Sequence, residues 1–288
     1  MDVIESHARS EDVASGLDAL EMAHAARTPW QRRLARIVLP KIVAVAVLLG
    51  IWQLAVTVHP SQVMPTPADV WSSFSDAVRQ GVISSAVATS LLHGAEGYLI
   101  AILLGTPLGL LVARVPLVRL GIGSIIAALQ SLPSVTWVPM GILWFGLDTQ
   151  MILFVVVMGA LPSIAGGMVG AVDHIPPLLP RVGASLGARG ITLYRHVILP
   201  AALPGYIAGL KQAWAFSWRS LMAAEIIANG PSLGTGLGQL LEQGRSLFDI
   251  PGMFATILTI LLVGVAVDAF VFAPLDRGVR RRRGLSTA

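Results

Sequence analysis

The sequence predicts an all-α, polytopic membrane protein with six transmembrane helices and both termini in the cytoplasm. The first reason is composition: of the 288 residues, 55% are hydrophobic and only 12% are charged, with a mean hydropathy of +0.74. Soluble domains are about 25% charged, and the core of a chain of this size cannot hide so much apolar surface. The other two reasons are the long charge-poor segments and the uneven placement of Arg and Lys along the chain.

Six apolar segments are predicted to cross a bilayer, which takes about 20 helical residues. The first contains a charge-free run from Ile42 to Val58, and the others follow between polar turns. Helical spacing over 68–80 predicts an amphipathic helix beside the membrane. The transmembrane domain is assigned to residues 37–276, with spans at about 38–58, 95–113, 121–145, 149–172, 200–227 and 253–272.

The polar ends of the chain are predicted to be cytoplasmic tails. Residues 1–36 begin acidic and lack an early apolar run, which argues against a cleavable signal peptide. Residues 277–288 form a basic C-terminal tail. With six spans, the two tails and the turns after spans two and four face the same side and hold sixteen basic residues, against two on the other side. Basic segments of membrane proteins stay in the cytoplasm, so both termini are expected there.

The longest polar interval between apolar segments is the loop 173–199. Its stretch from Arg181 to Pro200 carries three arginines and a histidine but no acid, and a glycine at 187 separates two short helical pieces. The positive-inside rule places this loop in the cytoplasm. A short cationic loop between spans is typical of a docking element for a cytoplasmic partner.

The spacing within this loop resembles the "EAA" loop of ABC importer permeases. Gly187 is followed by nine residues, Val197, one residue, and Leu199-Pro200. The phrases M-P-T-P-A-D-V-W at 64–71, P-M-G-I-L-W-F-G at 139–146 and L-P-A-A-L-P-G at 199–205 resemble the sulfonate/taurine/nitrate branch. The chain departs from the family at 181–183, which are Arg-Val-Gly instead of Glu-Ala-Ala. The role of the family's glutamate is therefore not assigned to any residue at 181–183.

This resemblance implies the type I importer permease fold and a non-catalytic subunit in a bacterial plasma or inner membrane. The expected partners are a second permease copy, two ATPase subunits, an extracytoplasmic solute-binding protein and the lipid bilayer, with no nucleic acid. ATP and Mg²⁺ would bind the ATPase, and no cofactor is expected on this chain. The resemblance implies ATPase coupling for Arg181, Val182, Gly183, Ala184, Leu186, Gly187, Ala188, Arg189 and Tyr194.

The expected cargo is a small oxyanion such as an aliphatic sulfonate, taurine or nitrate. The alternatives are an ABC importer of another small solute, a secondary transporter and an intramembrane enzyme. No phosphate-binding loop, H-E-x-x-H or G-x-S-x-G motif occurs, and the chain has no cysteine. The sequence therefore shows no recognisable binding site for a nucleotide and no recognisable active site for a hydrolytic reaction.

Three charged residues inside the fifth predicted span are candidates for a translocation path: Lys211, Arg219 and Glu225. Charges inside a span are costly and usually face a cavity or a partner. At 100° per residue, Lys211 and Glu225 lie within about 40° of one another on the helix. Two interpretations stay open: a polar lining that admits an anion, or side chains that reach the interface or hydrogen-bond a neighbouring helix.

Overall fold

The structure is a computed structural model that describes residues 30–59, 64–228 and 234–282. The chain divides into two units, Met1–Pro67 and Ala68–Ala288. The described part of the first unit is mainly the helix α2 (Trp30–Val58), in which Val38–Val58 has a mean hydropathy of 2.1 and is long enough to cross a membrane. Most of the predicted tail 1–36, up to residue 29, lies outside the described residues.

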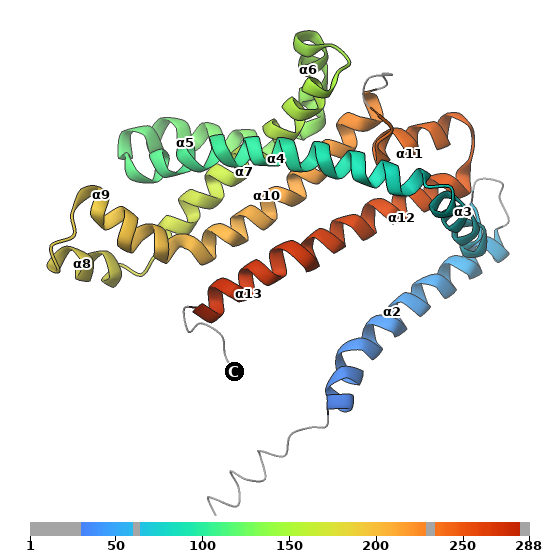
Figure 1. Cartoon of the computed structure of the whole chain (residues 1–288), viewed down its shortest axis with the longest axis horizontal. Helices are drawn as coiled ribbons and strands as arrows, with labels where there is room; N and C mark the ends of the chain where they lie inside the picture. The colour runs from blue at the N-terminus through green and yellow to red at the C-terminus, as the bar shows by residue number, and fades with distance from the viewer. Residues whose placement is uncertain (1–29, 60–63, 229–233, 283–288) are drawn as a thin grey trace, which may run out of the picture. The chain divides into compact units, whose positions relative to one another are not determined.

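The second unit is built from helices, with no strand in its described ranges (Figure 1). In chain order these are α3 (Pro67–Arg79), α4 (Val82–Arg114), α5 (Pro116–Ser131), η1 (Ser134–Trp137), α6 (Val138–Phe145), α7 (Thr149–Asp173), α8 (Leu178–Ser185), α9 (Gly190–Leu193), η2 (Tyr194–Ile198), α10 (Leu199–Ile227), α11 (Leu237–Ser246), α12 (Ile250–Val267), η3 (Asp268–Phe272) and α13 (Ala273–Arg282).

The core of this unit lies where α7 packs against both α4 and α10; in Figure 1, α7 and α10 run alongside each other and α4 crosses them. α7 contributes fully buried Val155 and Ile164, and α10 contributes Leu221. A hydrogen bond also joins α4 directly to α10. The Tyr98 hydroxyl of α4 donates to the Leu210 carbonyl of α10 at 2.7 Å. The predicted all-helical membrane fold is thereby confirmed.

α7 and α10 approach each other at two glycines. A Cβ atom added to Gly167 would lie 2.9 Å from the Cα of Gly209, and the reverse distance is the same. Real Cβ atoms essentially never come within 3.0 Å of another heavy atom, so any larger residue must push the helices apart. Small residues of this kind let transmembrane helices pack backbone to backbone.

The predicted span 121–145 is not one straight helix. α5 ends at Ser131, η1 and α6 continue to Phe145, and the two parts are bent by 102°. The cause lies at Pro133, because proline has no N–H to donate and disfavours the α conformation of the residue before it. Leu132 is accordingly extended, with φ −76° and ψ 130°.

Other helix limits also differ from the expected ones. α4 begins at Val82 rather than near 95, because neither proline nor glycine interrupts 82–93. α12, η3 and α13 follow one another without a turn from Ile250 to Arg282, so the basic tail begins as helix. α10 occupies 199–227, close to the expected 200–227.

The number of spans stays a prediction. Among the described residues, four helical stretches are long and apolar enough to cross a membrane, or five if the bent α5–α6 pair counts as one. α10 is not among them, and it carries three charged side chains. The count of six therefore requires α10 as a further, more polar span.

We expect Gly167→Ala to destabilise the protein, because its methyl group would meet the α10 backbone. Overpacking of this kind costs about 1–3 kcal/mol. Gly170→Ala is the matched control on the same helix, since no atom lies within 4 Å of a Cβ placed there. Thermal unfolding in detergent should show a lower midpoint for Gly167→Ala only, and equal midpoints for both variants would contradict the close packing.

Candidate functional site

The loop between α7 and α10 forms a compact turn of two short helices. At the end of α8, the Gly187 N–H donates to the Ala184 carbonyl at 3.1 Å and the Ala188 N–H donates to the Gly183 carbonyl at 3.0 Å. This pair of hydrogen bonds is the Schellman arrangement, which needs a left-handed residue after the helix. Gly187 supplies it with φ +88°. The sequence analysis predicted that two short helical pieces meet at this glycine, and the backbone bends there.

The turn is held against the rest of the unit. Gly183 packs against Leu193 and Val197, so α8 rests on the segment that leads into α10. The Arg114 guanidinium at the end of α4 lies 5.1 Å from the centre of the Tyr194 ring, which is a cation–π contact. The loop is therefore an ordered element attached to both α4 and α10.

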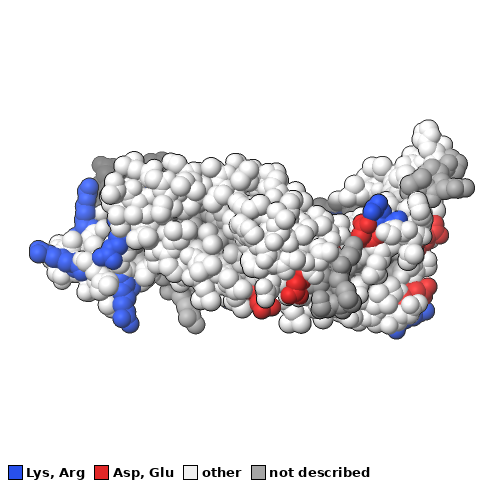
Figure 2. Space-filling view, turned by 90° about the horizontal axis from the view of Figure 1, so that it is seen from above, with Lys and Arg blue, Asp and Glu red and all other residues white. Residues whose placement is uncertain are grey.

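The outer face of the turn combines apolar and cationic side chains. Leu186 is 83% exposed and Ile191 is 73% exposed. Arg181, Arg189 and Arg195 are also exposed, and Figure 2 shows Lys and Arg side chains gathered at the end of the view where α8 and α9 lie in Figure 1. Ile191 was missed by the sequence analysis because the family's loop pattern does not mark that position.

Of the residues assigned to coupling, most face outward: Arg181, Val182, Ala184, Leu186, Gly187 and Arg189 are exposed, Ala188 and Tyr194 are half-buried, and Gly183 is buried. The structure thus brings the assigned residues together on one turn. Their contact with an ATPase stays a prediction.

Lys211 has an acidic partner. Its Nζ lies 2.8 Å from Oδ1 of Asp268, the first residue of the π-helical segment η3, and the two side chains are 54% and 44% exposed. A lone charge within a span is expensive, and this pair removes much of the cost. Asp268 was missed because nothing in a sequence shows which carboxylate faces a given lysine across two helices.

Arg219 differs from Lys211 in having no ion-pair partner in the described ranges. Its Nε donates to the Ala215 carbonyl at 2.9 Å, and its guanidinium lies 4.6 Å from the centre of the Phe216 ring. The side chain lines a cavity of about 220 Å³ together with Gln130 and Ser163. This cavity lies at the break between α5 and η1.

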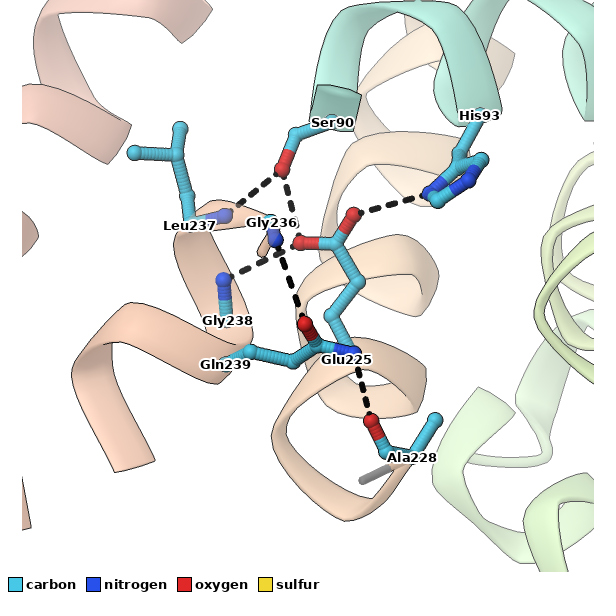
Figure 3. A network of polar contacts seen from close by, with 8 residues as sticks. All are labelled: Ser90, His93, Glu225, Ala228, Gly236, Leu237, Gly238 and Gln239. Carbon is cyan, nitrogen blue, oxygen red and sulfur yellow. Dashed lines mark hydrogen bonds and ion pairs between the residues drawn. The ribbon is translucent and has the colours of Figure 1, made fainter. Parts of the chain in front are cut away.

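Glu225 is fully buried, which differs from the lining expected for it (Figure 3). Its Oε2 accepts hydrogen bonds from Ser90 Oγ at 2.7 Å and from the Gly238 N–H at 3.0 Å, and Oε1 lies 3.4 Å from His93 Nδ1. Ser90 Oγ in turn accepts from the Leu237 N–H at 2.8 Å.

This network ties α10 to α4 and to the first turn of α11, whose N-terminal N–H groups favour negative charge. In this arrangement Glu225 is a structural carboxylate rather than a side chain open to a path. His93 of α4 lies beside Glu225, whereas the nearby Glu96 on the same helix is exposed.

The described residues contain no group of three or more His, Asp or Glu side chains that could hold a metal ion. The sites described above are the turn between α8 and α9, the Lys211–Asp268 ion pair, the cavity at Arg219 and the buried hydrogen-bond network of Glu225.

Comparison with known proteins identifies the class. The sequence profile described as "Binding-protein-dependent transport system inner membrane component" matches residues 105–281, and the chain belongs to this family. It is therefore an ABC transporter permease of the inner membrane type, as the sequence resemblance indicated.

The relatives and a solved structure agree with this assignment. The putative aliphatic sulfonates transport permease protein SsuC of Escherichia coli is 30% identical over 84% of this chain and 90% of its own length. The taurine transport system permease protein TauC of the same organism is 28% identical over 90% and 93%. A structure of the MetNI methionine ABC transporter, 21% identical, superposes with a TM-score of 0.58 over 67% of this chain and 94% of that chain. This last likeness shows the fold.

We expect the Lys211–Asp268 pair to stabilise the protein. Lys211→Met and Asp268→Asn each leave one charge without its partner, so both should lower the midpoint of thermal unfolding in detergent. The double variant leaves neither charge and should recover most of the loss.

ATP-driven uptake measured on the same three variants separates structure from transport. Recovery of both stability and uptake in the double variant fits a structural pair. Recovered stability with lost uptake would instead keep Lys211 in the translocation path.

Proposed function

We propose that this chain is the translocation subunit of an ATP-driven importer of small oxyanions of the aliphatic sulfonate, taurine or nitrate type. Two copies would pair, bind two cytoplasmic ATPase subunits, and receive solute from an extracytoplasmic binding protein. ATP and Mg²⁺ would be bound by the ATPase alone. The relatives named for sulfonate and taurine transport support the cargo class.

The observation that carries the proposal is the outward-facing turn between α8 and α9. Its exposed Leu186 and Ile191 offer an apolar contact, and its arginines offer charge. A turn rigidified by the Schellman hydrogen bonds and by the contact with Arg114 can transmit a push, because it cannot deform freely. Movement of the ATPase pair would then pass directly into α10, which begins at Leu199.

ATP-dependent uptake in reconstituted vesicles tests the function. We expect the chain, co-reconstituted with its ATPase and binding-protein partners, to accumulate radiolabelled taurine, an aliphatic sulfonate or nitrate only when ATP is present on the cytoplasmic side. The chain reconstituted alone should not respond to an ion gradient. Gradient-driven uptake by the chain alone would identify a secondary transporter instead.

The bend at Gly187 tests the coupling turn. Gly187→Val should weaken ATPase association or uncouple ATP hydrolysis from uptake, because a β-branched residue at φ +88° is strongly disfavoured. Gly187→Asn is the matched variant at the same position, since asparagine adopts the left-handed conformation more readily. Co-purification of the ATPase and uptake should be retained better in Gly187→Asn. Normal uptake by Gly187→Val at equal membrane levels would remove the role assigned to the turn.

A further inference from the structure

We propose that the cavity at the break between α5 and η1 is a binding site for an oxyanion, with Arg219 as its cationic group. This inference rests on the proposed function, because it names the point on the path where an anionic cargo is held. It adds three polar residues that the sequence did not single out: Gln130, Ser134 and Ser163.

The charge of Arg219 is available to a ligand. Among the described residues its guanidinium makes one hydrogen bond, from Nε to the Ala215 carbonyl of the same helix, and one face lies against the Phe216 ring, so both terminal nitrogens stay free of hydrogen bonds. No carboxylate pairs with this arginine within 64–228 or 234–282, in contrast to Lys211, Arg119 and Arg245. The two terminal nitrogens of a guanidinium form a fork that matches the oxygens of a sulfonate or nitrate.

The other polar groups of the cavity are also incompletely used. The Ser163 hydroxyl makes no hydrogen bond to any part of the chain that the structure describes, although the side chain is largely buried. Gln130 Nε2 donates one hydrogen bond, 2.8 Å long, to the Pro162 carbonyl, which leaves its second N–H for another acceptor. Ser134 opens η1 directly after Pro133. Buried polar groups normally find partners, so these groups suit a polar ligand.

The size of the cavity restricts the ligand. Pockets for drug-sized molecules are roughly 300–1,000 Å³, and this one is about 220 Å³. A small oxyanion fits these dimensions better than a peptide, nucleotide or sugar. Phe216 and Met158 in the wall can cover the short apolar part of an alkyl sulfonate.

A second cavity continues the path toward the coupling turn. It shares Gln130 with the first cavity and is lined further along by Gly166, Ser124 and Arg119. On α7, the first cavity is lined by residues between 158 and 163, and the second by residues between 166 and 169. The second cavity therefore lies closer to Asp173 at the end of α7. Gln130 therefore separates the two cavities.

The two arginines differ in a way that favours directional passage. Arg119 Nη1 donates to Asp173 Oδ1 at 2.9 Å, so its charge is already neutralised, whereas Arg219 has no acidic partner in the part of the chain that the structure describes. An anion would be attracted to the first cavity and held less strongly in the second. A weak second site suits release toward the cytoplasm.

The absence of native cysteine allows a direct test without transport. Ser134→Cys is introduced into the full chain purified with its partners, and its rate of reaction with an anionic reagent, sulfonatoethyl methanethiosulfonate, is compared with that of the cationic trimethylammonioethyl analogue. Ser84→Cys, an exposed site that lines neither cavity, corrects for the intrinsic reactivity of the two reagents. We expect the corrected ratio to favour the anion by about 25-fold, because one unit charge a few ångströms away speeds the anionic reagent about fivefold and slows the cationic reagent about fivefold.

The same ratio measured with Arg219→Met assigns the effect to this arginine. The preference should fall to the Ser84→Cys value with Arg219→Met and persist with Arg245→Gln, the control arginine, which is paired with Glu242 at the surface. A ratio at Ser134→Cys equal to that at Ser84→Cys, or a preference unchanged by Arg219→Met, would overturn the site.

Uptake measurements connect the site to transport and separate the two proposals. In vesicles that import taurine, an aliphatic sulfonate or nitrate, Arg219→Met should reduce uptake at least severalfold at unchanged thermal stability, and Arg219→Lys should retain part of it. Unchanged uptake by Arg219→Met in a transporting preparation overturns the site alone. If the unaltered protein with its partners imports none of the three anions, the cargo class of the proposed function fails, while the thiol-reagent ratio still reports whether the cavity attracts anions.

Discussion

The rest of the structure depends on the close approach of α7 to its two neighbours, α4 and α10. Apolar lipid offers little hydrophobic driving force between helices, so their association relies on van der Waals contact and hydrogen bonds. At Gly167 of α7 and Gly209 of α10, the backbones of these two helices meet without any side chain between them. Tyr98 joins α4 to α10 by a hydrogen bond in the same core. This packing sets the positions of every charged group on α10.

α10 connects two ordered ends of the unit. Its first turn follows the coupling turn, and its last turn holds Glu225 in a network with Ser90 and the N-terminal turn of α11. A buried carboxylate is tolerated only when its oxygens are hydrogen-bonded, and this one accepts from a hydroxyl and a backbone N–H. With 29 residues and a rise of about 1.5 Å per residue, the helix is roughly 43 Å long and joins these two ends.

The charges on α10 have three different environments. Lys211 is paired with Asp268, Glu225 is enclosed by hydrogen-bond donors, and Arg219 faces a cavity and has no acidic partner among the described residues. A path for anions needs attraction that is strong enough for entry but weak enough for release. In the proposed site, Arg219 followed by the neutralised Arg119–Asp173 pair would provide this gradient across two neighbouring cavities.

The sequence by itself determined the all-helical membrane class, the family and the glycine bend of the coupling turn, because hydropathy, charge placement and left-handed glycine positions are local properties. It could not determine the bend angle at Pro133, since a proline permits several kinks and neighbouring helices select one. Nor could it distinguish Lys211, Arg219 and Glu225, which look alike as isolated charges in an apolar run. Only the tertiary structure decided their environments, because the partner of such a charge lies on another helix, such as Asp268 for Lys211 or Ser90 for Glu225.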